Sequence, residues 1–118
     1  MVWYAAHAIM YVKFKEGEQD KYPVWENVIL IKGSSDEEAF ERAKNRAKED
    51  EINSDDFKWE DRPASLTYGG IRKLITCSDP DENPDDGTEI TYSQIEVDSE
   101  ESLFRLIEGE PVGVKYSE

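Results

Sequence analysis

The residues with the clearest chemical potential are the carboxylates of the segment DPDENPDDGTE, residues 79–89. It holds six acids and no base, namely Asp79, Asp81, Glu82, Asp85, Asp86 and Glu89. Calcium takes about six to eight oxygen ligands in a flexible geometry, and closely spaced carboxylates can supply them. Pro80, Pro84 and Gly87 would hold the segment in turns and so reduce the entropy lost on closing around an ion. The segment therefore predicts a calcium-binding loop.

This loop does not follow the EF-hand pattern. Asp79, Asp81 and Asn83 fit the first three ligand positions of an EF-hand loop. However, Pro84 stands at the glycine position, and Ile90 stands where the bidentate glutamate belongs. Two interpretations stay open: a calcium site of another type, or a solvated acidic loop that contributes only solubility.

Other acids could complete a calcium shell around the loop. The preferred loop ligands are Asp79, Asp81, Asp85 and Asp86. Asp36 and Glu38 form a second acidic group that could lend oxygen ligands, although acids in the first turn of a helix are also favoured by the helix dipole. A further acid-rich stretch, residues 49–61, is more typical of a solvated connection.

The sequence does not favour an enzyme. Carboxylate pairs can act as general acid and base, but they are too numerous here to single one out. His7, the only histidine, lies between alanines in an expected strand, where a packed or surface-strand role is more common than catalysis. Cys77 precedes an acidic run that would blunt its nucleophilicity. No glycine-rich phosphate loop, serine elbow or histidine metal motif occurs.

The charge of the chain restricts its partners. Twenty-eight acids against 14 bases give a formal net charge of −14 and a pI near 4.4. Such a field repels nucleic acids and anionic membranes and attracts divalent cations and basic protein surfaces. The leading hypothesis is a calcium buffer or sensor. The alternative is an acidic interaction or inhibitor protein without metal, which mimics nucleic acid or caps a basic partner as immunity proteins do. The lone cysteine and the absence of a basic and apolar leader favour the cytoplasm.

The pattern of apolar residues predicts the elements that carry these acids. Residues 3–14 and 22–33 are expected to form a hairpin. Ser34 or Ser35 caps an expected helix with an apolar stripe of Ala39, Phe40, Ala43 and Ala47. Residues 57–77 are expected to form one long bent strand or two short ones, and residues 89–97 another strand. Ser99 caps a second helix that ends at Gly109, and residues 111–117 form a short strand.

These elements predict one domain, residues 1–118, of the α+β class. The expected architecture is a small antiparallel sheet with two helices packed on one face. ILIKGSSDEEAFERA and SQIEVDSEESLFRLI share a strand, a serine cap, paired acids and an arginine, which suggests two ββα units. The resemblance is short, and coincidence stays open as the alternative, because a strand followed by a capped acidic turn is a common way to begin a helix.

Three short motifs resemble a family of small acidic bacterial domains of unknown function. They are Trp3 with Tyr4, the helix motif of residues 36–43, and the strand motif of residues 86–90. The resemblance implies a calcium buffer or sensor that binds ions through surface carboxylates. It implies no ligand set, because no ligand motif can be matched residue by residue.

Overall fold

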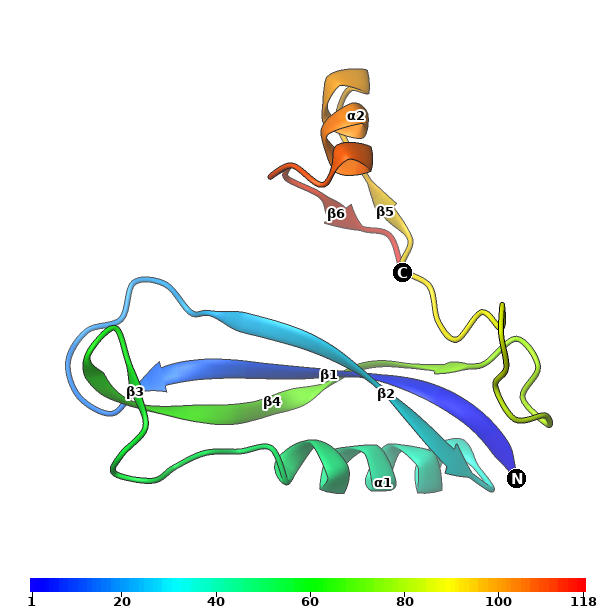
Figure 1. The fold of residues 1–118 in the computed structure, drawn as a ribbon, viewed down its shortest axis with the longest axis horizontal. Helices are drawn as coiled ribbons and strands as arrows, with labels where there is room; N and C mark the ends of the chain where they lie inside the picture. Colours follow the sequence, from blue (N-terminus) through cyan, green and yellow to red (C-terminus); the bar gives the residue numbers. More distant parts are fainter.

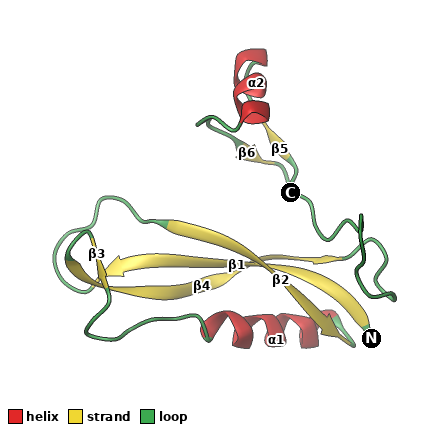
Figure 2. Cartoon of the chain, viewed as in Figure 1, coloured by secondary structure: helices red, strands yellow, loops and turns green.

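The computed structural model describes residues 1–118 and has the expected α+β class. The elements are β1 (Val2–Phe14), β2 (Val24–Gly33), α1 (Asp36–Lys48), β3 (Lys58–Trp59), β4 (Arg62–Thr76), β5 (Ile95–Glu96), α2 (Glu100–Glu108) and β6 (Lys115–Tyr116). Figure 1 shows a long twisted sheet with α1 along one face, and Figure 2 distinguishes helices from strands by colour. No helix is long and apolar enough to cross a membrane.

The main sheet is antiparallel and has the strand order β2-β1-β4-β3. The hairpin of β1 and β2 confirms the expectation for residues 3–33. Most of the segment 57–77 is the single strand β4, which bends at two irregularities in its pairing with β1. At each irregularity β4 contains one residue with no partner on β1. These residues are Arg72, which is skipped between the partners of His7 and Ala8, and Gly69, which is skipped in the same way.

The core between the sheet and α1 is built from very small side chains. Ala39 and Ala43 are fully buried against Tyr4, Ala6 and Ile31. Glycine lets the backbones approach closely, because a Cβ atom at Gly33 would lie 3.1 Å from the Ala39 Cβ atom. The alanine stripe of α1 is therefore confirmed, whereas Phe40 lies beside the interface and is 40% exposed.

Both helices begin at the serine caps that the sequence predicts, and α2 ends at the predicted glycine. Ser35 accepts a hydrogen bond from the Glu38 backbone N–H, and Ser99 accepts one from Ser102. Gly109 ends α2 in the left-handed conformation at φ 78°, which glycine adopts without a steric penalty. Local capping signals thus determine both helices.

Residues 94–118 form a C-terminal unit in which α2 connects the paired strands β5 and β6. It stands off from the main sheet in Figure 1, and the molecule measures 47 × 40 × 23 Å. The expectation of a strand over residues 89–97 is correct only for β5, since residues 88–94 are irregular. The two halves also differ in pairing: β5 pairs with β6, whereas the strand before α1 pairs with β1. The idea of two equivalent ββα units is therefore not supported.

Candidate functional site

The acidic loop, residues 79–89, lies beside the first residues of β1. The Trp3 backbone N–H donates to the Pro80 carbonyl at 2.9 Å, and the Trp3 indole donates to the Asn83 side chain at 3.3 Å. The Ser78 hydroxyl donates to the Glu89 carbonyl at 3.1 Å. The first half of the loop is therefore bonded to β1, and the residue before the loop is bonded to its last residue.

The acids of this loop have no cationic partner. Asp85 organises a turn, because its backbone N–H donates to the Thr88 hydroxyl and its carboxylate accepts from the Asp86 N–H. Every ion pair of the chain lies elsewhere. The loop thus presents a high density of uncompensated negative charge.

Asp36 and Glu38 lie in the first turn of α1. Ser34 donates to Glu38 from its backbone and its hydroxyl at 3.1 and 2.9 Å. These hydrogen bonds hold the pKa of Glu38 below its usual value. Burial, followed by a hydrogen bond with Asp36, raises the pKa of Tyr4. Glu38 therefore serves the cap of the helix.

The predicted ligands do not converge into a ready-made metal centre. No group of three or more His, Cys, Asp or Glu side chains is arranged to hold an ion. The predicted ligands lie on two separate elements: the acidic loop carries Asp79, Asp81, Asp85 and Asp86, and the first turn of α1 carries Asp36 and Glu38. Calcium binding by this set would require the loop to rearrange around the ion.

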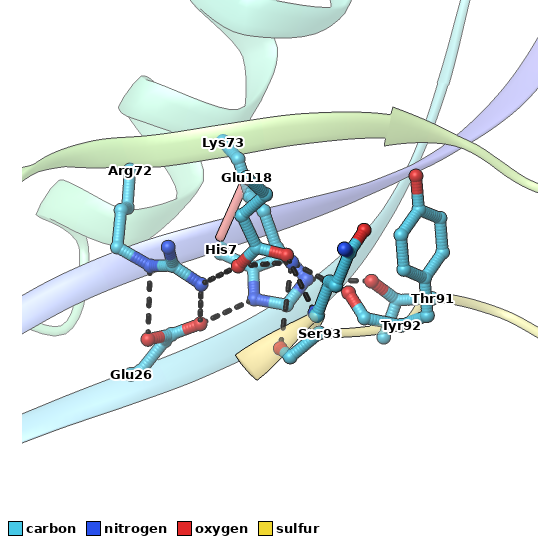
Figure 3. Close-up of polar contacts among 9 residues, drawn as sticks. His7, Glu26, Arg72, Lys73, Thr91, Tyr92, Ser93 and Glu118 are labelled. Carbon is cyan, nitrogen blue, oxygen red and sulfur yellow. Dashed lines mark hydrogen bonds and ion pairs between the residues drawn. The ribbon is translucent and has the colours of Figure 1, made fainter. Parts of the chain in front are cut away.

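A different set of polar residues does converge, around His7 on the sheet face opposite α1 (Figure 3). His7 is 2% exposed. Its Nδ1 atom lies 2.6 Å from Glu26 Oε2, and its Nε2 atom lies 2.6 Å from Thr91 Oγ1. Both ring nitrogens therefore have partners, as a buried imidazole requires.

The network continues through Arg72 to the end of the chain. Arg72 donates to both carboxylate oxygens of Glu26 at 3.1 and 2.9 Å and to Glu118 at 2.9 Å. The hydrogen bond from Arg72 is the main reason that the pKa of Glu26 lies below its usual value. The bulge in β4 allows Arg72 to reach Glu26, since it is the unpaired extra residue.

Glu118 closes this network from the C-terminal unit. It accepts from the Gln94 backbone N–H at 2.8 Å and forms ion pairs with Arg72 and Lys73, each at 2.9 Å. The Gln94 hydrogen bond, followed by the one from Lys73, lowers the pKa of Glu118 to about 2. The side chain thus fastens the C-terminal unit to the sheet.

Thr91, His7 and Glu26 form a hydrogen-bonded chain of a hydroxyl, an imidazole and a carboxylate. Hydrolases use the same three groups to activate a nucleophile. Both ring nitrogens of His7 are engaged, Nδ1 with Glu26 and Nε2 with Thr91. The burial of His7 confirms the packed histidine that was one of the two roles expected from the sequence.

Sequence reasoning missed every partner of His7. Glu26 and Arg72 are 46 positions apart, and no local pattern links them. The one available signal was Glu26 itself, an isolated carboxylate between Trp25 and Asn27, just before the apolar run of residues 28–31. Alternation places Glu26 on the same face as Val28, the pairing partner of His7.

The aromatic residues fall into two groups. Tyr4 is 5% exposed and belongs to the core. Trp25 is 41% exposed and contacts Trp59 edge to face, with ring centroids 5.7 Å apart. Together with Met10, Phe57 and Leu66 the two tryptophans line a hollow of about 370 Å³. Apolar surface is therefore accessible beside the core.

Comparison with known proteins assigns the chain to a family. Residues 3–93 match the model of a domain of unknown function, DUF4288, and the chain belongs to this family. No curated protein and no solved structure matches the chain. The match covers the main sheet, α1 and the acidic loop. Residues 94–118, which form the C-terminal unit, lie outside it.

Proposed function

We propose that this protein binds a basic protein partner through its acidic surface, as an interaction or inhibitor protein. The observation that carries the proposal is that most acids are exposed and lack a cationic partner, yet do not converge on a metal centre. Spread negative charge speeds association with a basic surface and discriminates against other partners. Because Cys77 is a free buried thiol, we further propose a cytoplasmic location.

Calcium binding is the second candidate, favoured by the loop acids that have no cationic partner. The motifs quoted above resemble those of the cyanobacterial calcium-binding protein CcbP, which is implicated in calcium control of heterocyst differentiation, and the proposal extends that role to this chain. On this proposal Asp79, Asp81, Asp85 and Asp86 bind the ion after the loop rearranges, with Asp36 or Glu38 completing the shell. The ligation would not be of the EF-hand type.

Calorimetry of the metal-stripped protein tests both candidates. Titration with a decalysine peptide is expected to give saturable binding that weakens about tenfold or more between low and high salt, because exposed charges are screened within about 8 Å at physiological salt. Absence of decalysine binding at low salt would contradict the first candidate. In a separate titration, saturable calcium binding weakened far more by Asp81→Asn than by Glu110→Gln would establish the second candidate. Equal, modest effects of both substitutions would reject the loop as a site.

A further inference from the structure

The C-terminal unit leaves an apolar helix face open to solvent. No residue of α2 is buried. The exposed fractions are 42% for Leu103, 56% for Phe104, 37% for Leu106 and 67% for Ile107. These positions lie on adjoining faces of the helix, since residues three or four apart are neighbours on its surface. A nine-residue helix is marginal in water on its own and normally depends on packing of its apolar side.

The apolar face has an acidic rim. Phe104 lines a hollow of about 390 Å³ whose other walls are Glu100, Glu101, Arg105, Glu108 and Glu110. The one base among them is already engaged, because Arg105 donates to Glu101 at 3.2 Å. The aromatic ring therefore lies in a hollow with an excess of negative charge.

The apolar face and its acidic rim together indicate which kind of partner α2 would bind. A lysine or arginine side chain in this hollow would meet glutamates and the aromatic ring of Phe104, the two groups that favour a cation–π contact. Apolar residues next to that cation would cover Leu103 and Ile107. The complementary surface is an amphipathic helix with one apolar face and basic flanks.

A second copy of the chain fits this surface poorly. In a two-fold contact the same patch faces itself, so Glu100, Glu101 and Glu108 would face identical glutamates. The net charge of −14 opposes any approach of two copies. Charge complementarity therefore favours a basic partner.

We propose that α2, with the hollow around Phe104, is a docking site for a basic amphipathic helix of a partner protein. The proposal rests on the proposed interaction function and specifies where the partner binds and what it presents. The site lies in residues 94–118, outside the matched family domain. The DUF4288 domain then acts as the scaffold, held to the docking unit by Glu118.

Two peptides of identical Lys and Leu content provide the probe: one places leucine on one helical face, and the other is scrambled. The amphipathic peptide is expected to bind the full chain at least tenfold more tightly by fluorescence anisotropy. The double variant Phe104→Gln with Ile107→Gln should abolish this preference. Glutamine is a good helix former, so α2 should persist. The control double variant Tyr22→Gln with Val24→Gln changes residues that are 51% and 56% exposed and should keep the preference.

The outcomes separate the two proposals. If neither peptide binds, the proposed function fails and the docking site fails with it. If both peptides bind equally and the α2 variant behaves like the wild type, the acidic surface binds bases but α2 is not the docking site. Equal losses in the α2 variant and the control variant would also overturn the docking site. Circular dichroism of each variant confirms that the helices are retained.

Discussion

Ala43→Leu is expected to lower the free energy of unfolding by about 3 kcal/mol, because the interface between α1 and the sheet has no room for a larger side chain. Ala43 is fully buried in a cluster with Ala39, Ala6 and Tyr4. Leucine at this position would push α1 away from β1 and disturb the neighbouring Ala39 contact with Gly33. The expected decrease in melting temperature is about 10 °C for a domain of this size.

Asn45→Leu is the matched control for this prediction. It introduces the same side chain two positions further along α1, where the residue is exposed. Its effect on unfolding should stay within about 0.5 kcal/mol. Urea unfolding of both variants provides the measurement. If the two variants lose the same stability, the close packing described for α1 is wrong.

Glu26→Ala is expected to destabilise the protein by about 2 kcal/mol. The substitution leaves buried His7 without a partner at Nδ1 and removes both Glu26 oxygens that accept from Arg72, which keeps only Glu118 as a side-chain acceptor. When one hydrogen-bond partner is removed, the buried group left behind is desolvated without compensation, which lowers the free energy of unfolding by about 1 to 3 kcal/mol. Glu101→Ala removes an exposed ion pair with Arg105 and should cost only about 0.3 to 0.5 kcal/mol. Equal losses in the two variants would show that the His7 network does not stabilise the fold.

The same network predicts a dependence on pH. Glu26 and Glu118 both have folded pKa values below the ordinary value of 4.5. A depressed pKa in the folded state stabilises the protein above the unfolded value, and the contribution is lost as the pH falls through the folded value. For Glu118 that loss extends down to a pH of about 2. The part of the stability difference between wild type and Glu26→Ala that comes from the lowered pKa of Glu26 should therefore shrink as the pH falls below 4.5. A difference that grows on acidification would contradict this sign.

The sequence was sufficient where structure depends on local signals. Ser35 and Ser99 cap the helices because a hydroxyl at this position accepts a hydrogen bond from a free backbone N–H. Gly109 ends α2 because glycine adopts the left-handed conformation without a steric penalty. The alternation of residues 3–14 and 22–33 specified the hairpin. The alanine stripe of α1 was also readable from its spacing.

Features that depend on contacts between distant parts of the chain could not be predicted from the sequence. The partners of His7 come from β2 and the segment before β5. Arg72 joins the network through Glu26, and the bulge that leaves it unpaired is a property of strand pairing. The strand expected over residues 89–97 is mostly irregular because these residues run to the C-terminal unit instead of joining the sheet. The open face of α2 was expected to pack, since apolar periodicity reports a face that needs a partner but not which molecule supplies it.

Selection from a random peptide library on the immobilised full chain tests the central claim most directly. The account predicts that the recovered peptides are enriched in lysine and arginine, carry apolar residues at helical spacing, and are released by high salt. Recovered peptides with no enrichment in basic residues, or peptides whose retention is unaffected by salt, would contradict the claim that this acidic protein binds a basic partner.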